Sequence, residues 1–168
     1  ILHWVLVICV FSNLFFNESG HPVHRAMGML ASACVLVRIV WGFVGTSHAR
    51  FSDWFPWPSR LFPYIKALLQ NRPPRFIGHN PLGAVMMLLL LTLVLGLGIS
   101  GFLMTTDAFY EDETLLSIHQ TLARIMIAAI VLHVIGALVE SWRHRENLIA
   151  SMIHGNKPRD PDNTADGK

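Results

Sequence analysis

Charge is scarce in this sequence, and the motifs of common soluble enzymes are missing. Only 14% of its 168 residues are charged and 52% are hydrophobic, whereas soluble domains have about 25% charged residues. This composition excludes an ordinary soluble domain and is typical of a membrane protein. The apolar segments also contain no Ser/His/Asp set and the chain has no glycine-rich phosphate loop, so hydrolysis and nucleotide binding are not supported.

Cysteine is scarce as well. Cys9 and Cys34 are the two present, and both lie in apolar runs. Because the chain has no CxxC or CxxCH motif, neither a covalently attached c-type haem nor a thiolate metal site is supported. Isolated cysteines in such runs are predicted to be small buried hydrophobic residues.

Long apolar segments are abundant by contrast. There are four of them, at residues 1–16, 24–44, 81–104 and 117–140. A membrane-spanning helix needs about 20 residues, so we expect the first segment to be the end of a helix that begins upstream of Ile1. The predicted fold class is all-α, an integral membrane four-helix up-down bundle over residues 1–155. A flexible cytoplasmic tail is predicted over residues 156–168, which are rich in Pro, Asp, Asn and Gly.

The distribution of charge predicts the orientation of this bundle. Residues 17–22 and 105–117 contain no Lys or Arg, while the connection after the second segment and the C-terminal tail carry several. The positive-inside rule therefore places the two short connections outside and both termini in the cytoplasm, in a bacterial inner membrane. The aromatic and basic residues of the long connection predict an interfacial helix near residues 59–70. Residues 143–154 are predicted to form a second, weaker one.

Four histidines pair by depth in these segments. His24 and His119, the outer pair, begin their segments at the outer side; His3 and His133, the inner pair, lie toward the cytoplasm. His133 follows His119 by fourteen residues, which is about 21 Å along one face of a helix. A lone histidine near a helix end is usually an interfacial residue, but agreement in depth favours two bis-imidazole iron sites. Zinc would need three or four ligands at one depth.

Other residues near these levels have two interpretations each. Arg38, fourteen residues after His24, either pairs with a propionate of an inner haem or extends to the lipid headgroups. His79 is expected to cap the third apolar segment or to contact a propionate. A flat macrocycle needs small residues one turn from its ligands, and these are Gly28, Ala123, Ala129, Gly136 and Ala137. Packing roles are predicted for Gly96, Gly98 and Gly101, and solvent exposure for His21, His48, His144 and His154.

With these residues the chain resembles the bacterial cytochrome b561 family, which includes the cytochrome b subunits of nickel-iron hydrogenases. The resemblance extends to about residue 157. Its most specific elements are His3-Trp4, His24 with Gly28 and Arg38, and His119 with His133; weaker patches are residues 38–45, 47–51, 78–81 and 145–148. The resemblance implies two non-covalent b haems and transmembrane electron transfer between a quinone pool and a partner.

Three functional classes follow from these observations. The first is an electron carrier that links quinone or quinol to a periplasmic c-type cytochrome or dehydrogenase subunit. The second, which the resemblance permits, is a superoxide oxidase that reduces quinone; the third is a non-redox membrane scaffold or transporter. Membrane lipid is an expected partner and nucleic acid is not, and a homo-oligomer stays open. A quinone would need an apolar slot with a polar handle, for which Arg38, Trp57, Tyr64 and His79 are candidates.

The acidic connection, residues 105–117, is either a solvated loop or a docking surface for a basic periplasmic partner. If it is a docking surface, reversing the charge of Glu111, Asp112 and Glu113 is expected to slow electron exchange with a basic cytochrome c. Stopped-flow rates at low ionic strength measure this effect, and unchanged rates there would argue for a solvated loop.

Overall fold

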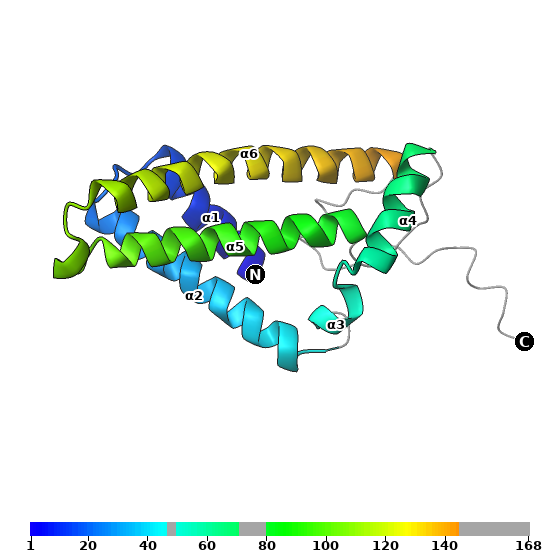
Figure 1. The fold of residues 1–168 in the computed structure, drawn as a ribbon, viewed down its shortest axis with the longest axis horizontal. Coiled ribbons are helices and arrows are strands. Elements are labelled where there is room, and N and C mark those ends of the chain that lie inside the picture. Colours follow the sequence, from blue (N-terminus) through cyan, green and yellow to red (C-terminus); the bar gives the residue numbers. More distant parts are fainter. Residues whose placement is uncertain (47–49, 71–79, 145–168) are drawn as a thin grey trace, which may run out of the picture. The chain divides into compact units, whose positions relative to one another are not determined.

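The computed structural model describes residues 1–46, 50–70 and 80–144, and the regular secondary structure in these residues consists of helices joined by turns and loops. The prediction of an all-α fold is therefore confirmed. The chain divides into two units, Ile1–Ile130 and Val131–Lys168, of which each is described by itself. The helices are α1 (Leu2–Phe15), α2 (Pro22–Val44), α3 (Phe51–Trp54), α4 (Pro58–Leu69), α5 (Pro81–Leu103), the 3₁₀ turn η1 (Asp107–Phe109) and α6 (Glu113–His144) (Figure 1).

Three of these helices are long and apolar enough to cross a membrane. They are α2, α5 and the part of α6 at Glu113–Arg143. Helix α1 is apolar but has only 14 residues, fewer than the roughly 20 that a span requires. The described residues therefore contain three candidate spans, where the sequence predicts four helices in the bundle.

Proline and short polar side chains determine where the spans begin. Pro22 and Pro81 occupy the first positions of α2 and α5, where a missing N–H costs nothing. The Asn80 side chain caps α5 by accepting a hydrogen bond from the Gly83 N–H at 2.6 Å. Asn80 thus fills the capping role predicted for His79, which lies outside the described residues.

Helix α6 begins at Glu113 and α4 at Pro58. The sequence predicted the first of these helices four residues later, because the acidic residues interrupt the apolar pattern there. The structure begins it earlier because the Asp112 carboxylate accepts a hydrogen bond from the Leu115 N–H at 2.8 Å, which satisfies an otherwise unpaired donor.

The helix predicted near residues 59–70 is confirmed as α4. Most of the second predicted interfacial helix, and the tail, lie outside the described residues.

A short helix that the sequence did not predict, α3, lies against the C-terminal part of α2. Its Phe51 ring packs edge-on against Phe43, with 5.3 Å between ring centres. A Cβ atom at Gly42 would overlap the same Phe51 ring. The single turn is therefore held by contact with α2 rather than by a periodic apolar pattern of its own.

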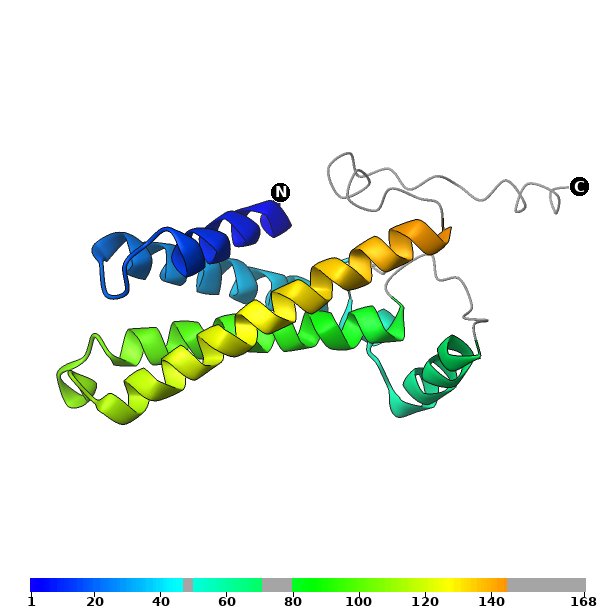
Figure 2. The same ribbon diagram turned by 90° about the horizontal axis from the view of Figure 1, so that it is seen from above.

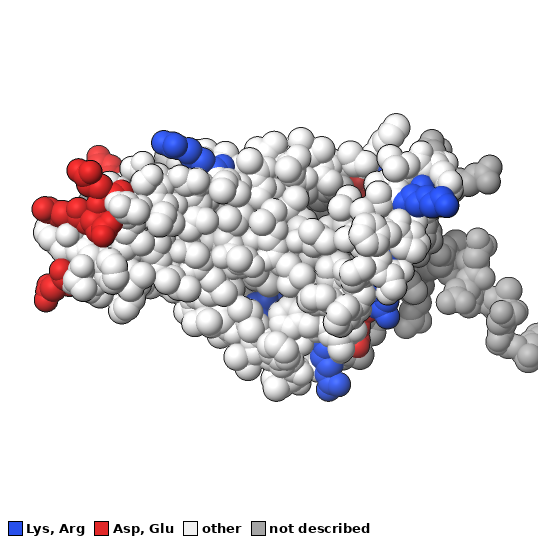
Figure 3. Space-filling view, viewed as in Figure 1, with Lys and Arg blue, Asp and Glu red and all other residues white. Residues whose placement is uncertain are grey.

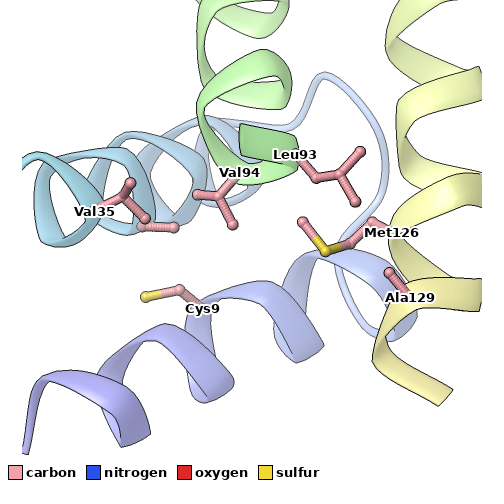
Figure 4. Packing of buried hydrophobic residues seen from close by; sticks show 7 residues of the cluster. Cys9, Val35, Leu93, Val94, Met126 and Ala129 are labelled. Atoms are coloured by element: carbon pink, nitrogen blue, oxygen red, sulfur yellow. The ribbon is translucent and has the colours of Figure 1, made fainter. Parts of the chain in front are cut away.

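The core of the first unit joins α1, α2, α5 and the N-terminal part of α6 (Figure 4). Helix α1 packs along α2, and α2 along α5 (Figure 2). Both cysteines are buried and free, as predicted. Ala129 also packs in this core. The buried members are Cys9, Ala31, Val35, Leu93, Val94, Met126 and Ala129.

The glycines of α5 permit the close approach of its neighbours, which confirms their predicted packing role. A Cβ atom at Gly98 would overlap the Ser32 hydroxyl of α2, and one at Gly96 would lie 3.2 Å from Leu122 of α6. Small residues at such positions let helices in membranes approach closely.

Acidic side chains gather at the connection between α5 and α6, and basic side chains lie over α3 and α4 (Figure 3). Asp107, Glu111 and Glu113 are exposed in the acidic connection, whereas Asp112 is half-buried. Because Asp112 also caps α6, variants aimed at a docking surface should leave this residue in place.

The contact at Gly98 makes a prediction about stability. Gly98→Ala is expected to destabilise the protein by about 1–3 kcal/mol through overpacking, although Gly→Ala in a helix usually stabilises by about 1 kcal/mol. Thermal unfolding in detergent measures the change. Adding Ser32→Ala removes the hydroxyl and should recover most of the loss. Equal losses in the single and double variants would show that the two helices do not meet there.

Candidate metal centre

Two histidines from different helices meet next to the acidic connection. His24 is the third residue of α2, and His119 is the seventh of α6. Their ring centres lie 6.3 Å apart with 62° between the ring planes, and both side chains are half-buried. The residues paired by depth in the sequence therefore lie side by side, while ligation by them stays a prediction.

The surroundings of His24 leave one nitrogen without a partner. Its Nδ1 is buried and has no hydrogen-bond partner among the described residues. The backbone at this position is held from α1, because the Asn13 amide donates to the His24 carbonyl at 2.8 Å. Asn13 in turn accepts a hydrogen bond from Asn17 at 2.9 Å. A buried polar atom without a partner costs free energy, so His24 fits a ligand that occupies this nitrogen.

The surroundings of His119 come from α5. The Ser100 hydroxyl lies 2.8 Å from His119 Nδ1, and Ser100 itself is only 4% exposed. A Cβ atom at Gly101 would lie 3.3 Å from His119 Cε1. The serine hydroxyl therefore contacts one atom of the imidazole, and the absence of a side chain at Gly101 leaves space beside the adjacent atom.

The chemistry of this arrangement suits one metal ion with two imidazole ligands. A metal lies about 2 Å from a bound imidazole nitrogen, and that nitrogen lies about 1 Å from its ring centre. Two imidazoles on opposite sides of one ion therefore have ring centres roughly 6 Å apart, close to the observed separation. Within the described part of the chain, no group of three or more His, Cys, Asp or Glu side chains is placed to hold a metal ion. Imidazole is a suitable ligand for iron.

The residues of the predicted inner level are divided between the units. His3 lies in the first turn of α1 and is exposed, with its ring 5.5 Å from that of Trp4. His133 is half-buried in the C-terminal part of α6. Because His3 belongs to the unit Ile1–Ile130 and His133 to Val131–Lys168, the pairing of these two residues stays a prediction.

Arg38 has aromatic neighbours. Its guanidinium carbon lies 5.6 Å from the ring centre of Phe51 and 5.8 Å from that of Trp54. These distances are in the range of cation–π attraction, which neither predicted role for Arg38 included. Among the quinone candidates, Tyr64 is buried and Trp57 is exposed.

Of the four histidines predicted to be solvent-exposed, His21 is exposed but also has a structural role. It is the N-cap of α2, and its Nδ1 accepts a hydrogen bond from the Val23 N–H at 3.3 Å. His144 is the last residue of α6. His48 and His154 lie outside the described residues.

Sequence reasoning missed Ser100 and Asn13 as parts of this centre. A signal for Ser100 was present, since it is one of two hydroxyl residues in α5, the other being Thr92. Hydroxyl groups in apolar helices often serve a polar partner on a neighbouring helix. The contact of Asn13 with the backbone of His24 had no comparable signal, because it depends on how α1 packs against α2.

Comparisons with known proteins identify the family of this chain. The family described as prokaryotic cytochrome b561 matches residues 1–155. A probable Ni/Fe-hydrogenase B-type cytochrome subunit of Rhizobium leguminosarum bv. viciae is 26% identical over 160 residues, which cover 80% of this chain and 67% of the relative. The subunit of the same description from Rhodobacter capsulatus is 25% identical over 165 residues, covering 80% and 61%.

A probable Ni/Fe-hydrogenase 1 B-type cytochrome subunit of Escherichia coli K12 is 23% identical over 201 residues, covering 92% of this chain and 86% of the relative. The chain thus spans about two thirds of the length of the first two relatives. No solved structure is a significant match. Because the family match extends over residues 1–155 of the 168 in the chain, the chain belongs to the prokaryotic cytochrome b561 family.

Proposed function

We propose that this chain transfers electrons across a bacterial cytoplasmic membrane through two b-type haems, one at the outer pair and one at the inner pair. The observation that carries the proposal is the meeting of the His24 and His119 rings, 6.3 Å apart between apolar helices. Haem b supplies a one-electron redox couple whose potential depends on its axial ligands and surroundings. The b-type cytochrome relatives support this choice of cofactor.

At the outer level, His24 and His119 are the proposed iron ligands. The unpartnered Nδ1 of His24 supports this role, because ionisable groups in membranes are expensive and usually functional. Gly28 and Ala123, each four residues after a proposed ligand, are the proposed small residues beside a flat group; the Asn13 side chain of α1 lies on the same side of α2 as Gly28. The Asn13 side chain of α1 donates a hydrogen bond to the His24 carbonyl and so fixes the position of the backbone that carries the imidazole.

At the inner level, His3 and His133 are the proposed ligands. The support for His133 is helical geometry, since α6 continues without a break from His119 to His133 and the rise is about 21 Å. Arg38 is the proposed partner of a haem propionate, with Phe51 and Trp54 orienting its guanidinium. Its place fourteen residues after His24 supports the same depth, and His79 is a second propionate candidate from sequence alone.

The proposed architecture is a four-helix bundle in which α1 is the fourth helix. Its support is that Cys9 of α1 packs in the same core as α2, α5 and α6. The distribution of charge supports an outer side at the acidic connection and cytoplasmic termini. A quinone or quinol at the inner end exchanges electrons with a nickel-iron hydrogenase, another dehydrogenase or a c-type cytochrome at the outer side.

The outer pair can be tested by single substitutions. His24→Ala and His119→Ala are each expected to remove one of two b haems per chain, because one remaining imidazole holds iron poorly. A pyridine haemochrome assay of the purified protein, with its reduced-minus-oxidised spectrum, measures the content. His21→Asn, which preserves the cap at the same end of α2, is the matched control. Full haem content in both alanine variants would refute the assignment.

The inner pair makes a separate prediction. His3→Ala and His133→Ala are each expected to remove one component from a potentiometric titration and to leave the component that depends on His24 and His119. The reason is that the two levels are separated by about 21 Å along α6. If His133→Ala instead removed the component that depends on His24, the proposed levels would be wrong. A parent protein with one haem per chain would also rule out two sites.

A further inference from the structure

Ser100 is a buried polar residue at the outer end of an apolar helix, and it contacts a histidine from another helix. It is 4% exposed, and its hydroxyl oxygen lies 2.7 Å from the Gly96 carbonyl and 2.8 Å from His119 Nδ1. A hydroxyl carries one hydrogen, so Ser100 can donate to only one of these groups. How that hydrogen is used determines the tautomer of His119.

The shorter contact is the ordinary bond of a helical serine to the carbonyl four residues earlier. With its hydrogen used there, the Ser100 oxygen can only accept from His119, which requires a proton on Nδ1. A neutral imidazole protonated at Nδ1 has its lone pair on Nε2. Ser100 would thus leave Nε2, the nitrogen on the far side of the ring, free to bind a metal.

Gly101 contributes the space for this contact. A Cβ atom there would lie 3.3 Å from His119 Cε1, which is tighter than ordinary van der Waals contact. A side chain at this position would require the ring to shift by a few tenths of an ångström. Ser100 therefore contacts one edge of the imidazole, and Gly101 leaves the space that this edge occupies.

We propose that Ser100 is a positioning residue for His119. The Ser100 oxygen accepts a hydrogen bond from His119 Nδ1–H, and His119 thereby presents Nε2 to the iron. The proposal rests on the function proposed above. A hydrogen-bond acceptor behind a metal-bound imidazole fixes its orientation and raises its basicity. A more basic ligand stabilises ferric over ferrous iron, so the contact with Ser100 should lower the midpoint potential of the outer haem.

The test compares Ser100→Ala, Ser100→Thr and Thr92→Ala by potentiometric titration of the detergent-purified, haem-loaded protein. Ser100→Ala is expected to shift the midpoint potential of the outer haem to more positive values and to weaken haem retention by about 10–100-fold. Ser100→Thr keeps a hydroxyl and should remain close to the parent. Thr92 is the matched control, because it bonds to the Leu88 carbonyl on the same helix at 2.9 Å and should leave the potential unchanged.

An unchanged or more negative potential in a fully loaded Ser100→Ala variant would overturn the proposal, and so would an equal shift in Thr92→Ala. A negative shift would indicate that Ser100 donates to Nδ1 instead. If Ser100→Ala does not fold, Ser100→Cys retains a weaker acceptor of similar size and should give a smaller positive shift of the midpoint potential. An unchanged potential in Ser100→Cys would also overturn the proposal. If His119→Ala retains both haems, the proposed function itself is wrong. If His119→Ala loses a haem but Ser100→Ala leaves the midpoint potential unchanged, only the role proposed for Ser100 is wrong.

Discussion

Hydrocarbon offers no hydrogen-bond partner to a polar group, and the rest of this structure depends on that constraint. Backbone groups are satisfied within helices, and the hydroxyls of Ser32, Thr92 and Ser100 each bond to a carbonyl one turn earlier. The imidazoles of His24 and His119 have no such local bond among the described residues and depend on groups outside their own helices. His119 has Ser100 as a partner, whereas the buried Nδ1 of His24 has none within the part of the chain that the structure describes. At the His24–His119 centre, therefore, one buried nitrogen lacks the hydrogen-bond partner that the apolar surroundings require, as far as the described residues show.

The geometry of the centre follows from how closely the helices approach. Gly98 lets α5 lie against Ser32 of α2, and Gly96 lets it lie against Leu122 of α6. Close contact with both neighbours makes α5 the element that relates the two histidine-bearing helices within the first unit. A helix without a histidine thereby determines the spacing of two histidines, and it also supplies the hydroxyl beside one of them.

Charge and aromatic residues complement this apolar core at its ends. The acidic connection lies beside the outer pair. Asp112 has two roles there, because it is part of the charged surface and its carboxylate caps α6. At the other end of α2, Arg38 lies over the rings of Phe51 and Trp54. A cation in apolar surroundings needs such partners, and the unpredicted helix α3 supplies them.

The sequence by itself determined the helical class, the apolar segments, the presence of a helix near residues 59–70 and the pairing of His24 with His119 by depth. These properties depend on composition, periodicity and helical rise, which are local. Only the tertiary structure decided that Asn13 holds the backbone of His24, that Ser100 contacts His119 and that α3 packs under Arg38. Each of these contacts joins residues from different helices, and their distances depend on how side chains interlock between the helices. No periodicity within a single segment encodes that packing.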